Sequence, residues 1–166
     1  MQFLAEQVSH HPPISVSRCQ GKGWTAGESV DVKATYMGNS IHISNSGPMA
    51  ARYISLTGTN DYYTWTLPKA VVSNLFIGGT FIDHFGEIEL VNHTTKTSSV
   101  LHLQKCGWFS AGRYRVSGEL LDPDSTVVAS YEGYWNKYLD CDRVSKAHGQ
   151  GVVRLWAAGK HLLSEE

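Results

Sequence analysis

The sequence predicts an all-β protein, built as an antiparallel meander of about nine or ten strands that curls into a barrel or packs as a sandwich. Three observations support this prediction. Charged residues make up only 17% of the 166 residues, whereas glycine occurs 16 times and tyrosine 8 times, a composition typical of strands and turns. Apolar and polar residues alternate with a period of two in several segments. Turn-forming residues recur about every 8–12 positions, with no helical stretch between them.

The first half of the chain shows the alternation most clearly. Residues 30–36 place valine, alanine and tyrosine at every second position, which predicts a strand with one buried and one solvated face. Gly38-Asn39 then predicts a hairpin turn into residues 41–43. Residues 62–66 also have a strand-like composition, and Pro68 should end or bulge that strand.

The second half continues the same pattern and then changes character. Strands are expected over residues 71–77, 80–92, 99–103, 114–120 and 126–135, with a turn at 122–125. Beyond Cys141 the chain becomes polar and glycine-rich at 143–151, and residues 155–163 could form a short helix. We therefore predict a domain over residues 1–144 and a loosely ordered, irregular or helical C-terminal tail over residues 145–166.

Charge and cysteine content exclude several classes of protein. With 14 basic and 15 acidic residues the net charge is −1, which argues against a nucleic-acid partner held by phosphate attraction. Cys19, Cys106 and Cys141 are widely spaced and form no CxxC pair, so we expect reduced thiols in a cytosolic protein and neither a disulfide framework nor a zinc site. No apolar run approaches the ~20 residues that cross a bilayer, so any membrane contact is expected to be peripheral.

Residues 6–13 read EQVSHHPP and carry two adjacent imidazoles before two prolines. The residue before a proline avoids the α region, so His11 and Pro12 are predicted to be extended. In a polyproline-like or bent stretch neighbouring side chains diverge by about 120°, which lets His10 and His11 converge on one anion. A phosphate favours the protonated, two-donor form of an imidazole, whose ordinary pKa is about 6.5. A metal ion is the competing ligand, but no third metal-binding residue lies at a helpful spacing. It is an equally good interpretation that His10 and His11 are ordinary turn residues.

The octapeptide resembles the signature of the oxysterol-binding-protein family, whose common form reads EQVSHHPP. Further segments agree with the family in the same order; they lie at residues 63–65, 74–79, 82–86, 91–93, 107–109, 116–118 and 133–137. The resemblance covers about residues 3–144, with a fainter similarity at 154–156. It implies that the strands form part of an incomplete β-barrel of the oxysterol-binding-protein type.

The resemblance also implies a function. Family members hold a sterol or phospholipid in a barrel under a lid and exchange it for phosphatidylinositol 4-phosphate between membranes. His10 and His11 would bind the inositol 4-phosphate headgroup as phosphate donors rather than as catalysts. The residues expected to support the motif structurally are Glu6, Gln7, Ser9, Pro12 and Pro13. The family implies no enzyme activity, no cofactor and no metal. It implies a cytoplasmic protein that contacts membranes peripherally where the endoplasmic reticulum meets another organelle.

Two parts of the family pattern have no match in this chain. In the family, a lid and a strand with a headgroup-binding Lys and Asn precede the motif. A downstream cluster of Lys, Glu and Arg completes the phosphate site, and we do not transfer it to Lys160, Glu165 or Glu166. The chain is therefore predicted to be the central part of the domain. Alone it is expected to be unstable or to bind lipid poorly, because it exposes an unpaired strand edge and apolar lining.

Two other classes of function remain open from the sequence. A hydrolase or metal enzyme could use His10, His11 and a carboxylate, which a metal-content measurement would reveal. A truncated remnant of the family could keep a structural or interaction role without transfer. Asp83-His84 could also suggest acid–base chemistry together with Glu87 and Glu89. Carboxylates at a period of two on a strand are, however, usually solvated surface groups.

Overall fold

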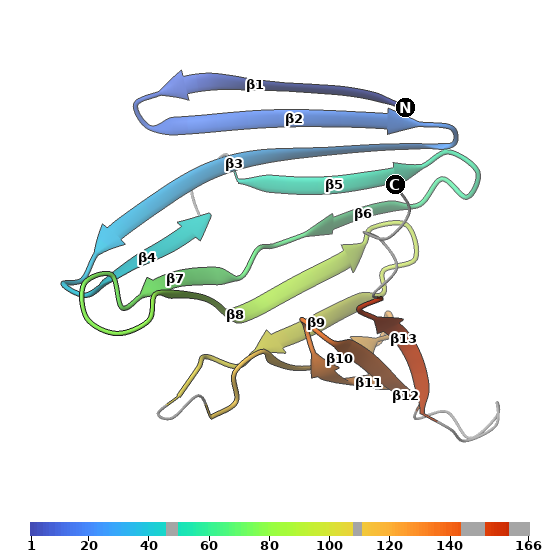
Figure 1. Cartoon of the computed structure of the whole chain (residues 1–166). Coiled ribbons are helices and arrows are strands. Elements are labelled where there is room, and N and C mark those ends of the chain that lie inside the picture. Colours follow the sequence, from blue (N-terminus) through green and yellow to red (C-terminus); the bar gives the residue numbers. More distant parts are fainter. Residues whose placement is uncertain (46–49, 108–110, 144–151, 160–166) are drawn as a thin grey trace.

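The structure, a computed structural model, describes residues 1–45, 50–107, 111–143 and 152–159. Within these ranges the chain forms one antiparallel sheet of thirteen strands and no helix (Figure 1). This confirms the predicted all-β class. The strands are β1 (Gln2–His10), β2 (Pro13–Gly21), β3 (Trp24–Tyr36), β4 (Ser40–Asn45), β5 (Ala51–Leu56), β6 (Tyr62–Trp65), β7 (Lys69–Ser73), β8 (Phe81–Asn92), β9 (Ser98–Leu103), β10 (Arg115–Leu121), β11 (Val127–Tyr134), β12 (Tyr138–Arg143) and β13 (Val153–Ala157).

The strand order departs from a simple meander in the middle of the sheet. Neighbouring strands follow the order β1-β2-β3-β4-β7-β8-β9-β10-β11-β12-β13, while β5 pairs with β3 and β6 pairs with β8. The long strand β3 therefore serves β5 with its first half and β4 with its second. Strand β8 likewise pairs with β7 through Phe81–Phe85 and with β6 through Leu90–Asn92. Two strand pairs, β4–β7 and β5–β6, thus lie between β3 and β8, and we call them the two arms of the sheet.

On β9 to β12 the register separates an apolar inner face from a polar outer face. Leu103, Val116, Gly133 and Leu139 lie directly opposite one another on β9 to β12, and residues opposite one another share a face. Leu103 and Val116 are buried, so we call this the inner face. The row displaced by one residue carries charged and polar side chains on the outer face, namely Glu87, His102, Ser117, Glu132 and Asp140. This is the period of two that the sequence predicted.

The C-terminal segment corrects one expectation. Val153–Ala157 form strand β13, which pairs with β12, so the expected helix over 155–163 is wrong for residues 155–157. Arg154 explains the difference, because its guanidinium binds both carboxylate oxygens of Asp140 on β12, at 2.7 and 2.9 Å. The sheet therefore continues beyond residue 144. The remaining parts of the predicted tail, residues 145–151 and 160–166, lie outside the described residues.

Candidate functional site

The octapeptide folds as a β-hairpin at the edge of the sheet. Strand β1 ends at His10, β2 begins at Pro13, and these two residues pair, so His11 and Pro12 form the turn between them. The His11–Pro12 peptide bond is cis. The predicted extended conformation of His11 and Pro12 is wrong, because the flanking strands are antiparallel and the chain must reverse within two residues.

The hairpin presents both imidazoles to solvent. His10 and His11 are exposed, and neither side chain has a hydrogen bond or ion pair to any residue that the structure describes. A register shift at Val8 interrupts the ladder just before them, and such bulges re-aim the side chains that follow. The ring nitrogens of the two adjacent histidines are thus available for an external acceptor.

The other residues of the motif surround the turn without side-chain contacts of their own. Glu6 and Gln7 are exposed and Ser9 is half-buried, and none of their side chains bonds to another part of the described chain. Pro12 stands in the turn and Pro13 opens β2, where the missing N–H groups remove two donors from the hairpin end. A structural role for Glu6, Gln7 and Ser9 stays a prediction.

Sequence reasoning missed a buried carboxyl group close to this hairpin. Asp31 on β3 lies opposite Ile14 of β2, which in turn lies opposite Ser9 of β1. Asp31 is buried, and its backbone N–H donates a hydrogen bond of 2.7 Å to Asn45 Oδ1. The alternation of β3 places Asp31 in its polar row, so nothing in the sequence signals its burial, which becomes visible only when β3 pairs with β4.

A separate polar feature, which the sequence also did not reveal, lies on the inner face. Arg52 of β5 and Glu28 of β3 face each other, with 2.9 Å between Arg52 Nη2 and Glu28 Oε2, and the Arg52 side chain is only 13% exposed. Ser17 Oγ donates to the other carboxylate oxygen at 3.2 Å. These residues line a hollow of about 140 Å³ together with Cys19, Ala26, Gly27 and Trp65. A partly buried ion pair therefore lies in an otherwise mostly apolar wall.

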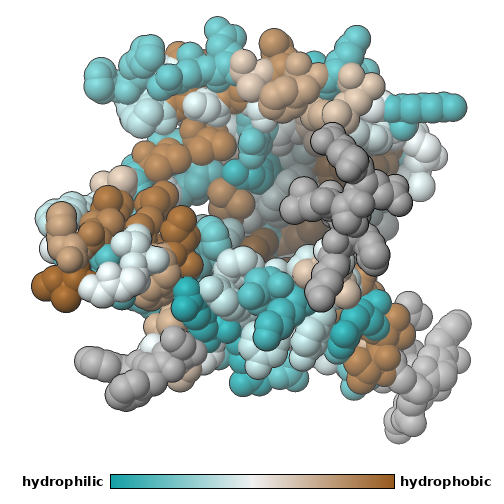
Figure 2. Space-filling view, viewed as in Figure 1, coloured by the Kyte–Doolittle hydropathy of each residue, from teal (hydrophilic) through white to brown (hydrophobic). Residues whose placement is uncertain are grey.

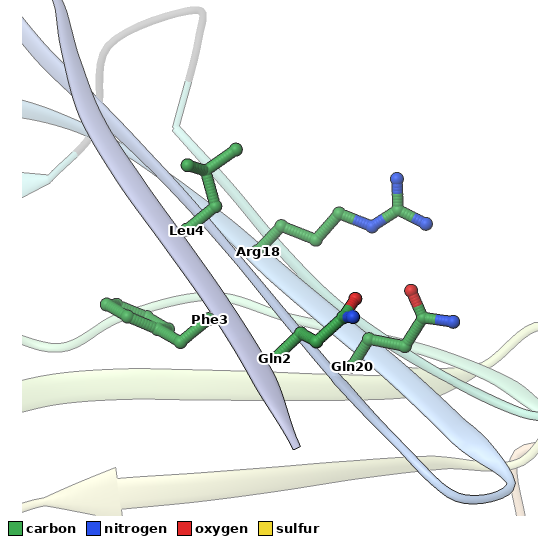
Figure 3. Close-up of a pocket in the computed structure, with 5 residues that line it drawn as sticks. All are labelled: Gln2, Phe3, Leu4, Arg18 and Gln20. Atoms are coloured by element: carbon green, nitrogen blue, oxygen red, sulfur yellow. The ribbon is translucent and has the colours of Figure 1, made fainter.

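A larger hollow lies next to this ion pair, where the two arms of the sheet diverge. It measures about 320 Å³ and is lined by Asn45, Ala50, Ala51, Arg52, Trp65, Thr66 and Leu67. A third hollow, also about 320 Å³, lies along the β1–β2 edge and is shown in Figure 3. Gln2, Leu4, Arg18 and Gln20 point to one side there and Phe3 to the other. None of these three hollows is lined by His10 or His11.

The described residues offer little support for a metal enzyme. No group of three His, Cys, Asp or Glu side chains among them could hold a metal ion. Asp83, which the sequence singled out beside His84, is fully buried on β8 and accepts a hydrogen bond from the backbone N–H of Cys106. Glu87 lies on the outer face and pairs with His102 at 3.1 Å, as expected for a surface carboxylate. No helix in the described ranges has the length and apolar character to cross a membrane.

Comparison with known proteins identifies the family. The sequence model described as "Oxysterol-binding protein" matches residues 1–163, so this chain belongs to the oxysterol-binding protein family. The resemblance seen in the octapeptide is thereby confirmed. The family is one of binding proteins and not of enzymes.

Individual relatives come from an amoeba, a plant and a mammal. The chain is 30% identical to oxysterol-binding protein 11 of Dictyostelium discoideum over 158 residues, which is 93% of this chain and 27% of the relative. It is 33% identical to oxysterol-binding protein-related protein 3B of Arabidopsis thaliana over 86% of this chain, and 33% identical to the human oxysterol-binding protein-related protein 2 over 83%. The chain spans only 31% and 28% of the lengths of the latter two.

Solved structures share the fold. The Osh1 ORD domain in complex with cholesterol superposes with a TM-score of 0.75 at 25% identity, over 95% of this chain and 37% of that one. The Osh3 ORD of Saccharomyces cerevisiae in complex with PI(4)P gives a TM-score of 0.76 at 22% identity, over 95% and 40%. The thirteen strands thus correspond to part of a larger domain in those structures.

Proposed function

We propose that this chain binds lipids as part of a transfer domain. In this function it holds a sterol or phospholipid and phosphatidylinositol 4-phosphate and moves them between membranes. The observation that carries the proposal is the EQVSHHPP hairpin, which ends in two solvent-exposed imidazoles without a described partner. Membership of the oxysterol-binding protein family supports it, as do the cholesterol and PI(4)P complexes of two structural neighbours.

The chemistry assigned to His10 and His11 is phosphate binding. Adjacent protonated imidazoles donate charge-assisted hydrogen bonds to a phosphate monoester, each worth about 1.5–3 kcal/mol. An imidazole beside such an anion favours the two-donor form. Because His10 ends β1 and His11 opens the two-residue turn between the paired strands, little freedom beyond the rotamers of the two side chains is lost on binding.

The inner face is the proposed contact surface for the acyl chains or the sterol rings. Its rows over β9 to β12 present the half-buried Leu101 and Leu139 beside the buried Leu103 and Val116, and burying the apolar surface that is still exposed contributes roughly 25 cal/mol per Å². The Glu28–Arg52 pair and Trp65 supply a polar point on this face. We propose that the protein is cytoplasmic and meets membranes peripherally, with residues 1–144 as the lipid-binding unit.

Extraction of phosphatidylinositol 4-phosphate from liposomes tests the proposal. The full chain should remove the lipid from donor liposomes, and the double variant His10→Ala/His11→Ala should lose most of this activity. The variant His102→Ala is the matched control, since it removes an exposed imidazole from the outer face. Equal extraction by the double variant and the wild type would assign the histidines no role. A wild-type chain that folds but extracts no lipid would favour a structural or interaction role instead.

A further inference from the structure

Two loop tips at one end of the sheet expose large apolar side chains. Met37, in the β3–β4 turn, is 61% exposed, and the preceding Tyr36 is 60% exposed. Phe76 and Ile77, in the β7–β8 loop, are 75% and 79% exposed. We call these four residues the apolar rim. Figure 2 shows hydrophobic residues gathered at this end of the molecule, over the β3–β4 turn and the β7–β8 loop. Exposed apolar residues grouped in this way mark an interaction site.

Asn39 holds the two tips together. Its side-chain oxygen accepts hydrogen bonds from the backbone N–H groups of Phe76 and Ile77, at 2.8 and 3.3 Å. Its side-chain nitrogen donates to the carbonyl oxygen of Ile77 at 3.1 Å, and its own carbonyl accepts from Leu75 N at 3.1 Å. The β7–β8 loop is therefore fixed to the β3–β4 turn by four hydrogen bonds. The exposed side chains therefore lie on a loop that is already ordered, so binding does not have to offset the conformational entropy of ordering it.

The composition of the two tips also lowers the free-energy cost of transferring them from water into an apolar medium. Residues 36–41 read YMGNSI and residues 74–82 read NLFIGGTFI, without one charged side chain. Asn74 satisfies further backbone groups within the loop, since its Nδ2 donates to the Gly79 carbonyl and its carbonyl accepts from Thr80 Oγ1. Paired backbone groups and the absence of charge lower the cost of entering an apolar medium.

The apolar rim and the histidine turn lie at the same end of the sheet. Strands β1, β2, β3, β4, β7 and β8 are each antiparallel to the next. The C-terminal ends of β1, β3 and β7 therefore lie at the same end of the sheet, as Figure 1 shows. The proposed headgroup site and the rim consequently face the same direction.

We propose that the apolar rim inserts into the interfacial region of a lipid bilayer and docks the protein with the His10–His11 turn facing the membrane. This inference rests on the proposed lipid-binding function, because a protein that takes lipids from membranes must meet a bilayer surface. A bilayer is favoured over a protein groove because the rim is a convex, uncharged projection on the same side as a site for a membrane lipid headgroup. Apolar side chains that enter the interfacial region anchor a protein to the bilayer through the apolar surface area that they bury.

Vesicle binding and soluble-ligand binding together test the inference. Co-flotation with phosphatidylcholine vesicles, with and without phosphatidylserine, is measured for the wild type and for Phe76→Ser/Ile77→Ser. The double variant should lose at least about 30-fold in vesicle partitioning, because two largely exposed apolar side chains no longer insert. Leu4→Ser is the matched control, since Leu4 is 70% exposed on β1 outside the rim, and it should partition like the wild type. Ile77→Ser alone should show an intermediate loss and guards against misfolding of the double variant.

Binding of a water-soluble, short-chain phosphatidylinositol 4-phosphate separates docking from ligand binding. The rim variants should bind this ligand like the wild type, since no bilayer is involved. If the wild type fails to bind it while vesicle binding still depends on Phe76 and Ile77, the proposed function fails and the docking inference stands. Wild-type-like flotation of both rim variants, or no flotation of the wild type, would overturn the inference. Loss of a dimer in the rim variants with unchanged flotation would overturn it too, in favour of self-association.

Discussion

Asp83 offers a sharp test of how the sheet is held together near β9. Its side chain on β8 is fully buried, and its Oδ2 accepts a hydrogen bond of 2.7 Å from the backbone N–H of Cys106. In Asp83→Ala this N–H, in a half-buried residue, loses its acceptor, which costs about 1–3 kcal/mol. The space left by the carboxyl group adds roughly 1 kcal/mol. We expect a total loss of about 3 kcal/mol, or a melting temperature lower by about 6–12 °C for a chain of this size.

The substitution Asp83→Asn separates the hydrogen bond from the rest of the effect. Its side-chain carbonyl can still accept from Cys106 N, so Asn should lose less stability than Ala; the amide nitrogen takes the place of Asp83 Oδ1, which has no hydrogen-bond partner among the described residues. Thermal unfolding followed by circular dichroism measures both variants, and hydrogen exchange of the Cys106 amide reports the bond itself. Equal losses for Ala and Asn, or faster Cys106 exchange in neither, would refute the reasoning. A structural role of this kind also accounts for Asp83 without acid–base chemistry.

Two further predictions concern the sheet. A Cβ added to Gly118 on β10 would lie 2.2 Å from the Val100 carbonyl oxygen of β9, so Gly118→Ala should cost about 3 kcal/mol by overpacking. Gly58→Ala, where a Cβ meets nothing within 4 Å, should stay within about 0.5 kcal/mol. Urea unfolding measures the free energy of unfolding of both variants. Hydrogen bonds from Arg154 hold the pKa of Asp140 below its ordinary value of 3.8. A lowered pKa stabilises the fold above that value, and the contribution is lost as the pH falls through the folded-state pKa. Amide exchange in β13 should therefore accelerate selectively in acid, and it should show no such acid step in Asp140→Asn.

The sequence predicted most of the strands because their signal is local, although thirteen strands are described instead of nine or ten and the strand expected over 71–77 ends at Ser73. A period of two and turn residues such as Gly38-Asn39 act within a few positions, and the observed β3–β4 hairpin follows them. Pairing between distant segments has no such signal. The division of β3 between β4 and β5, and with it the Glu28–Arg52 pair, depends on contacts 24 residues apart. For the same reason residues 155–157 were open to a helical interpretation until β12 provided their partner.

The candidate site also has parts that a local sequence pattern predicts and parts that depend on contacts between distant segments. The octapeptide identified the family and the two histidines because it is a contiguous motif, and the structure adds the hairpin that exposes them. The apolar rim could not be predicted, since Phe76 and Ile77 have the composition of core residues. The structure shows that these two side chains are exposed and that Asn39 fixes their loop to the β3–β4 turn.

Direct titration of the protein with short-chain phosphatidylinositol 4-phosphate tests the central claim, that His10 and His11 bind the lipid phosphate. Because two charge-assisted hydrogen bonds are lost, the affinity of His10→Ala/His11→Ala for this lipid should be lower than that of the wild type by roughly 100-fold or more. The affinity of His102→Ala should be unchanged, and unfolding midpoints of all three proteins should agree, because these imidazoles are exposed. Equal affinities for the double variant and the wild type would contradict the account.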